Sequence, residues 1–320
     1  MRFLLIALLA MTSPFVQSMT LLNQPLVLEV PAGQLHGSLL LSKTDQPLPV
    51  ALLIAGSGPT DRNGNNPMGH NDSIKRLAQS LAREGIASLR YDKRGIGQSL
   101  ALAPDERDLS VEAYAADAVA WIKKLQDDPR FASVIVIGHS EGALIASLAA
   151  AQQPVAALIT LAGSGRPIDE VLREQLQGRL PPALLATSHY LIDELRSGRT
   201  HEPVPQALEV LFRPSVQPYL ISLFRQDPAQ AFAKVAAPAL IIQGTHDMQV
   251  GVEDAQALQR SRPDAELLTI AGMNHVLRIV PADPKKQLAS YNEPSLPIAR
   301  ALTEGIIQFL QAHGIKPASS

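Results

Sequence analysis

Short apolar runs alternate along the chain with longer segments in which apolar residues recur every three or four positions. Residues 26–30 and 35–42 flank the turn Pro31-Ala32-Gly33 and predict a β-hairpin. The other runs that predict strands are 50–55, 86–91, 134–137, 155–161, 239–243 and 266–270. Helical spacing between them is clearest over 73–83 and 111–125. This alternation predicts a doubly wound, mostly parallel α/β sheet.

Residues 166–232 interrupt the alternation. The segment contains several prolines and short helical patterns but no convincing strand. An unstructured loop of this length would be unusual inside a compact domain. We therefore predict a helical cap over 166–232, inserted into a core that consists of residues 19–165 and 233–320.

The first residues predict export. Arg2 precedes the apolar run 3–11, and helix breakers and small residues follow as far as Ser18. This is the order of a secretory signal peptide. The run is about half the ~20 residues that a membrane span needs. We therefore expect residues 1–18 to be cleaved, the protein to be periplasmic or secreted, and no stable membrane anchor to remain.

The composition narrows the possible functions. Hydrophobic residues make up 46% of the chain and charged residues 18%, which is typical of a globular enzyme. A formal net charge of -2 gives no electrostatic reason to expect a nucleic-acid partner. The chain has no cysteine, which excludes disulfides, thiolate metal sites and a cysteine nucleophile. No metal-binding cluster or dinucleotide fingerprint occurs, so we expect neither metal nor cofactor.

Gly138-His139-Ser140-Glu141-Gly142 directly follows residues 134–137, a run that is apolar on both faces and typical of a central parallel strand. A helical pattern begins at Ala143. A strand that turns sharply into a helix crowds its neighbours, so glycines are needed two positions before and after the turn. The turn would lift the Ser140 hydroxyl clear of the sheet, and we predict that Ser140 is a nucleophile.

A serine nucleophile needs a general base, which an acid holds in place. Asp247 follows the predicted strand 239–243, and His275 follows the strand 266–270. The order serine, aspartate, histidine fits a strand-turn-helix nucleophile of this kind. We expect Asp247 and His275 to complete a catalytic triad, and we interpret His246 as a residue that shapes its loop.

The tetrahedral intermediate of acyl transfer needs amide donors for its oxyanion. One predicted donor is the backbone N–H of Glu141. The other is the N–H of Ser57, with Gly56 as its nearest rival, in the glycine-rich loop Gly56-Ser57-Gly58-Pro59.

The predicted turn at residues 138–142 and the predicted triad resemble those of the α/β-hydrolase superfamily. Three segments, 55–65, 91–99 and 272–277, together with 290–294, are similar to its bacterial branch of serine-aminopeptidase-like esterases. The resemblance covers nearly all of the chain after Ser18. It implies the α/β-hydrolase fold with an inserted helical cap, and carboxylesterase activity on small-molecule esters with short acyl groups. Ala55 departs from many relatives, which have histidine there.

Several residues are candidates for substrate contact. Four lie in or just after the glycine-rich loop 56–59, which we call the oxyanion loop, and three are aromatic residues of the cap. The first four are Gly56, Gly58, Asp61 and Arg62, and the aromatic residues are Phe212, Tyr219 and Phe224. We interpret Asp92 and Arg94 as parts of a structural turn whose charges pair with neighbouring loops.

Other functions stay open at this stage. An aminopeptidase would need an acidic pocket for the substrate's amino terminus. The acidic residues of the cap lie among arginines in helical patterns, and we interpret them as parts of solvent-exposed helix faces. They are Asp169, Glu170, Glu174, Asp193, Glu194 and Glu202. An acyltransferase would use the same triad. A non-enzymatic binding protein would usually lack a member of the triad.

Overall fold

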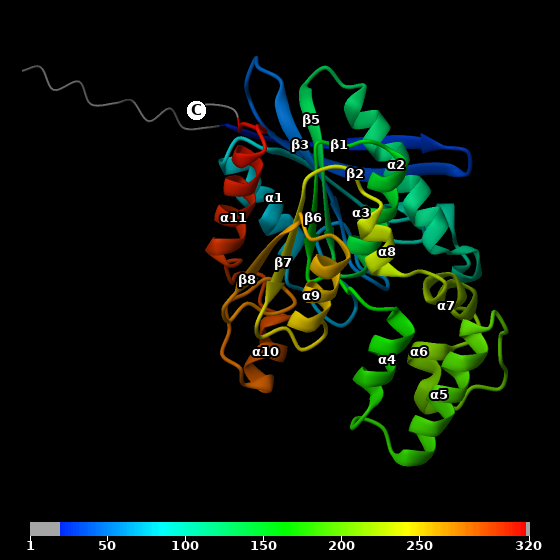
Figure 1. Cartoon of the computed structure of the whole chain (residues 1–320). Coiled ribbons are helices and arrows are strands. Elements are labelled where there is room, and N and C mark those ends of the chain that lie inside the picture. Colours follow the sequence, from blue (N-terminus) through cyan, green and yellow to red (C-terminus); the bar gives the residue numbers. More distant parts are fainter. Residues whose placement is uncertain (1–19, 318–320) are drawn as a thin grey trace, which may run out of the picture.

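A computed structural model of the chain describes residues 20–317, in which eight strands form one sheet in the order β1-β2-β4-β3-β5-β6-β7-β8 (Figure 1). The strands are β1 (Leu21–Val30), β2 (Gly33–Ser42), β3 (Leu48–Ile54), β4 (Ala87–Tyr91), β5 (Phe131–His139), β6 (Ala157–Leu161), β7 (Ala239–Gly244) and β8 (Glu266–Ile270). β1 and β2 form the predicted antiparallel hairpin, β2 pairs antiparallel with β4, and all other pairs are parallel. The predicted fold class is confirmed. The predicted signal peptide, residues 1–18, lies outside the described residues.

The central strand β5 explains its continuous apolar run. It lies between the parallel strands β3 and β6. Val134 and Val136 pack into the core on one face of the sheet, and Ile135 and Ile137 pack into the core on the other. A strand covered on both faces buries every side chain, so it needs apolar residues at consecutive positions.

Helices cover both faces of the sheet (Figure 1). On one face lie α1 (Ser73–Arg83) and α11 (Arg300–Ala312). On the other lie α2 (Val111–Gln126), α3 (Glu141–Gln152), α8 (Pro228–Ala233) and α9 (Val252–Ser261). Gly85, at φ 75°, follows α1 and lets the chain turn into β4, as its position in the sequence predicts.

The segment between β6 and β7 is helical, as expected. It contains α4 (Ile168–Leu176), α5 (Pro182–Arg196), α6 (Glu209–Phe212), α7 (Gln217–Phe224) and then α8. The group α4 to α7 stands apart from the sheet in Figure 1. The last helix, α8, instead packs against α3 and α9, and Phe232 in it is fully buried. This helix therefore belongs with those that cover the sheet, although the sequence pattern placed it in the cap.

The remaining short elements are α10 (Pro284–Ser290) and three 3-10 turns at Gly97–Leu102, Glu106–Asp108 and Gln206–Leu208. None of the helices in residues 20–317 combines the length and the apolar character that a membrane span requires.

Several acidic residues of the cap form ion pairs with arginines. Arg173 contacts Asp193 at 2.6 Å, and Arg199 contacts Glu194 at 2.7 Å. Asp169 corrects the expectation of a solvated face, because its side chain is 0% exposed and accepts a hydrogen bond from Arg196. It lies on the inner side of α4, which packs against α5, so its charge is buried between two helices.

Candidate active site

Four parallel strands end at the same edge of the sheet, and the loops that follow them carry the predicted site. The oxyanion loop follows β3, Ser140 follows β5, Asp247 follows β7 and His275 follows β8. Ile54 at the end of β3 is in register with Gly138 near the end of β5. The oxyanion loop therefore begins at the same level as the turn that carries Ser140. In open α/β sheets, ligands bind at this edge.

The turn at Ser140 has the strained geometry that its sequence predicts. Ser140 adopts φ 56° and ψ -123°, a conformation rare for any residue but glycine, and its N–H donates to the Leu161 carbonyl at 2.8 Å. A Cβ on Gly138 would lie 2.1 Å from the Gly142 carbonyl oxygen. A Cβ on Gly142 would lie 2.3 Å from the Ile54 oxygen. Both glycines are therefore required by backbone contact.

Asp247 and His275 come together as the sequence predicts. His275 Nδ1 donates a hydrogen bond to Asp247 Oδ2 at 2.8 Å, and the exposed fractions of the two side chains are 6% and 1%. The other carboxylate oxygen, Oδ1, accepts from the amides of Gln249 (2.8 Å) and Val250 (3.0 Å). A carboxylate held in this way fixes the ring so that its Nε2 can act as a base.

The surroundings of Asp247 keep it ionised. Burial raises the pKa of its carboxyl, but the charge and hydrogen bond of His275, with the amides of Val250 and Gln249, lower it more. The net result is a pKa below the ordinary 3.8. His246, next to it, bonds the Val280 carbonyl through Nδ1 at 2.6 Å, which confirms its role in shaping the loop.

His139 contacts the predicted base, which the sequence interpretation missed. Its ring lies 4.8 Å from the His275 ring, centroid to centroid, and its Nε2 donates to the His275 carbonyl oxygen at 2.8 Å. Burial and the neighbouring His275 lower the pKa of His139 to about 4, so its ring is neutral near pH 7. These contacts of His139 link the turn of the nucleophile to the loop of the base. In the part of the chain that is described, no hydrogen bond joins Ser140 directly to His275.

The predicted oxyanion donors come from the start of α3 and from the loop that follows β3. Glu141 is the first residue of α3, and the first amides of a helix have no acceptor within it. Across from it, a Cβ on Gly56 would lie 3.2 Å from the Ser140 Cβ, so the oxyanion loop closely approaches the nucleophile. Thr60 Oγ1 donates to the Ser57 carbonyl at 2.7 Å, and Lys93 Nζ donates to the Gly56 carbonyl at 2.5 Å. These bonds brace the loop.

The other predicted contacts near this loop differ in their surroundings. Gly58 adopts φ 66° with open space where a Cβ would be. Asp61 Oδ1 accepts from the amides of Asn63 and Asn65. Arg62 contacts Asp92 at 2.6 Å. The last two side chains therefore stabilise the loop, and their contact with substrate stays a prediction.

The expected structural turn at Asp92 and Arg94 is present. Asp92 pairs with Arg62 and also accepts from the Gln98 amide at 3.0 Å. Arg94 contacts Asp117 of α2 at 2.6 Å. Both charges therefore pair with neighbouring segments, as the sequence interpretation holds.

The three aromatic residues of the cap are buried to different degrees. Phe212 is 0% exposed, and its side chain packs with the other buried residues of the core. Tyr219 is 8% exposed, and burial together with the nearby Glu141 carboxylate raises the pKa of its hydroxyl well above 10. Phe224 is 5% exposed. Of the three, Tyr219 is the one that lies near Glu141, the residue after Ser140. Substrate contact by all three stays a prediction.

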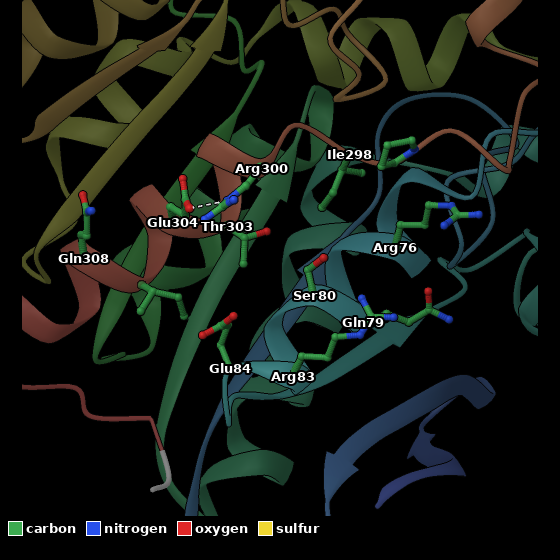
Figure 2. Close-up of a pocket in the computed structure, with 12 residues that line it drawn as sticks. Arg76, Gln79, Ser80, Arg83, Glu84, Ile298, Arg300, Thr303, Glu304 and Gln308 are labelled. Carbon is green, nitrogen blue, oxygen red and sulfur yellow. Dashed lines mark hydrogen bonds and ion pairs between the residues drawn. The ribbon is translucent and has the colours of Figure 1, made fainter. Parts of the chain in front are cut away.

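A hollow of about 610 Å³ lies elsewhere, between α1 and α11 (Figure 2). Its lining includes Arg76, Arg83 and Glu304, but no member of the predicted triad or oxyanion hole. Within residues 20–317, no three histidine, cysteine, aspartate or glutamate side chains gather so as to hold a metal ion.

Comparison with known proteins finds a matching family and an esterase relative. The model of the alpha/beta hydrolase family matches residues 51–290. Esterase EstD from Thermotoga maritima is 28% identical over 253 residues, which are 78% of this chain and 59% of that protein. This chain thus aligns with less than two thirds of its curated relative.

Solved structures share the fold at low sequence identity. Est1E from Butyrivibrio proteoclasticus, solved with bound ferulic acid, is 18% identical, with a TM-score of 0.59 over 89% of this chain and 99% of that one. XC6422 from Xanthomonas campestris, described as an a/b serine hydrolase without lid, is also 18% identical, with a TM-score of 0.52 over 96% of this chain and 100% of that one. These likenesses concern the fold.

Proposed function

This chain belongs to the alpha/beta hydrolase family, and on that basis we propose that it is a serine hydrolase that cleaves carboxylic esters. Ser140 is the nucleophile, His275 the general base and Asp247 the acid that orients it. The amides of Ser57 and Glu141 bind the oxyanion.

The first half of the reaction acylates Ser140. His275 Nε2 removes the proton of the Ser140 hydroxyl as its oxygen attacks the ester carbonyl. Asp247 keeps Nδ1 protonated and stabilises the imidazolium that forms. The oxyanion accepts hydrogen bonds from the two amides, and the intermediate collapses when His275 protonates the departing alcohol.

The second half releases the acid. Water replaces the alcohol, and His275 takes a proton from it as its oxygen attacks the acyl-enzyme carbonyl. The same two amides stabilise the second oxyanion. When this intermediate collapses, Ser140 leaves with the proton from His275, which regenerates the enzyme and frees the carboxylic acid.

One observation carries the proposal. The His275–Asp247 hydrogen bond of 2.8 Å occurs at Nδ1, so the other ring nitrogen is left for the nucleophile. The His275–Asp247 pair lies at the same edge of the sheet as the strained Ser140 turn. The two features come from different parts of the sequence, since Ser140 follows β5 and the pair follows β7 and β8. A hydrolase needs them together.

Short acyl chains are the proposed substrates. The support is the family resemblance and the esterase relative. An aminopeptidase is the alternative. Asp169, Asp193 and Glu194 already pair with arginines, which counts against these three carboxylates as the ligands of the substrate's amino terminus.

A substrate series tests the proposal. Nitrophenyl esters of increasing acyl length are compared with aminoacyl nitroanilides on the purified protein, and an added alcohol reports acyl transfer. We expect butyrate esters to react fastest and water to be the main acceptor. Faster turnover of the anilides would favour the peptidase, and a dominant ester product with the alcohol would favour an acyltransferase.

Export is a separate part of the proposal. The charged, apolar and small-residue order of residues 1–18 supports cleavage after Ser18. Protein recovered from a bacterial periplasm is expected to begin at Met19 by intact-mass analysis. Retention of residues 1–18 would contradict it.

A further inference from the structure

Lys93 is a buried cation beside the nucleophile that the proposed mechanism does not use. It follows β4, and its side chain is 1% exposed. Its Nζ donates to the Gly56 carbonyl at 2.5 Å and lies 3.6 Å from Glu141 Oε1. The ammonium also lies 5.0 Å from the centre of the Tyr114 ring. A single charge thus contacts the oxyanion loop and the residue after the nucleophile.

The contact with Gly56 acts on the first oxyanion donor. The Gly56 carbonyl and the Ser57 N–H belong to one planar peptide unit, in which they point in opposite directions. An ammonium that binds the oxygen therefore fixes the direction of the N–H. It also draws electron density toward the oxygen, which makes the N–H a stronger donor, since linked hydrogen bonds reinforce one another.

The contact with Glu141 involves the second donor. The backbone of Glu141 supplies the other oxyanion amide. The side-chain carboxylate of the same residue lies beside the Lys93 ammonium. Lys93 therefore connects the two residues whose amides bind the oxyanion. The spacing between these amides has to match one oxygen atom, so a link between them bears directly on the reaction.

Stability alone explains this pair poorly. Taking two charges out of water is costly, and an apolar pair of similar volume is often as stable or more stable. Burial lowers the pKa of Lys93, and the nearby Glu141 carboxylate offsets part of this change. The carboxylate therefore favours the charged form of Lys93 at a site that otherwise disfavours charge.

We propose that Lys93 is a positioning residue for the oxyanion hole, which holds the Gly56–Ser57 peptide in its donating orientation and couples it to Glu141. The inference rests on the proposed function. Lys93 does not touch the substrate, and it acts through the Ser57 amide. Its removal is expected to weaken binding of the transition state more than binding of the ester.

The test compares an oxygen ester with its thionoester, in which sulfur replaces the carbonyl oxygen. Sulfur accepts hydrogen bonds weakly, so an oxyanion hole favours the oxygen ester. In Lys93→Met, kcat on the oxygen ester is expected to fall about 10- to 100-fold, with KM changed less than about threefold. The ratio of kcat/KM between the two esters is expected to fall by about tenfold or more.

A matched control is Arg94→Met, one residue further along. It breaks the Arg94–Asp117 ion pair, which lies outside the proposed machinery. This variant is expected to keep the wild-type ratio, whatever it loses in stability. If Lys93→Met does not fold, the double variant Lys93→Met/Glu141→Gln removes both buried charges and is expected to show the same lowered ratio.

The outcomes separate the two proposals. A folded Lys93 variant with the wild-type ratio overturns the inference, even if its kcat falls, because a general structural defect slows both esters alike. If wild-type protein cleaves neither ester, or if Ser140→Ala cleaves both as well as wild type, the proposed function fails and the inference falls with it. Loss of the ratio in Lys93→Met, with Ser140 dependence intact, supports both.

Discussion

At the scale of single residues, the site depends on a chain of polar contacts that ends in Asp247. Asp247 is held by two amides and His275, and His275 is further held by His139. Each contact restricts the ring of the proposed base. The consequence is that the residues should act as a unit, with unequal effects when each is removed.

Triad substitutions test this unit. Ser140→Ala removes the attacking oxygen and His275→Ala the base, so each is expected to lower kcat by about a million-fold, and the double variant hardly more. Asp247→Asn leaves the reacting atoms in place and is expected to cost about ten-thousand-fold. Steady-state kinetics on a nitrophenyl ester measures these losses, and circular dichroism checks the fold. Additive losses in the double variant would contradict the account.

His139 predicts a pH dependence of stability. Its pKa falls from 6.5 to about 4 on folding. Above pH 6.5 it is neutral in both states, but below that the unfolded chain binds a proton that the folded protein does not. The free energy of unfolding should therefore decrease by about 3 kcal/mol between pH 6.5 and 4. The lowered pKa of Asp247 acts in the other range, where its contribution is lost below about pH 3.8.

Urea unfolding of wild type and His139→Gln at several pH values checks this. The variant lacks the titrating ring, so its unfolding free energy should change less over the same interval. Parallel curves for the two proteins would show that His139 does not carry the effect.

At the scale of elements, the turn between β5 and α3 is fixed by backbone contact rather than by side chains. A Cβ on Gly142 would meet the Ile54 oxygen at 2.3 Å, and neither strand nor helix can move without disturbing the sheet. Gly142→Ala is expected to destabilise the protein by about 3 kcal/mol or more and to abolish activity. Thermal unfolding measures the loss.

Gly178 supplies the control. It has φ 77° and open space at its Cβ position. Asparagine tolerates this conformation, so Gly178→Asn is expected to change stability by less than about 1 kcal/mol. A Gly142→Ala protein as stable as this control would mean that the turn is less constrained than its geometry indicates.

The helices of the cap yield two different expectations for neighbouring aromatic residues. Phe212 is fully buried, so Phe212→Ala should cost about 3–5 kcal/mol in stability. Tyr219 approaches Glu141, so Tyr219→Ala should change the relative rates across an acyl-length series, by about 1–3 kcal/mol of discrimination. Melting temperatures and the ester series separate the two effects. Unchanged relative rates in Tyr219→Ala would remove α7 from the substrate site.

At the scale of the whole molecule, the order of strands and helices could be predicted from the sequence. Local periodicity carries that information, and the turn at Ser140 and the residues Asp247 and His275 follow predicted strands. The start of the first strand could not be predicted in this way: β1 begins at Leu21, five residues before its apolar run. Pairing with β2 extends it through residues 21–25, where Asn23, Gln24 and Pro25 interrupt the apolar pattern.

Contacts between distant segments could not be predicted in the same way. Lys93 lies 37 residues from Gly56, and His139 lies 136 residues from His275. Such pairs depend on which loops the sheet order brings together. The buried Asp169 is a similar case, because only the packing of α4 on α5 turns its charge inward. The sequence therefore predicts the proposed reacting groups but not the residues that hold them.

The identity of the nucleophile is the central claim, and active-site labelling tests it most directly. A fluorophosphonate should add one label per chain, and peptide mapping by mass spectrometry should locate it on Ser140. The Ser140→Ala variant should take up no label and should lose ester hydrolysis, while its circular dichroism matches that of the wild type. A label on another residue, or appreciable ester hydrolysis by folded Ser140→Ala, would contradict the account.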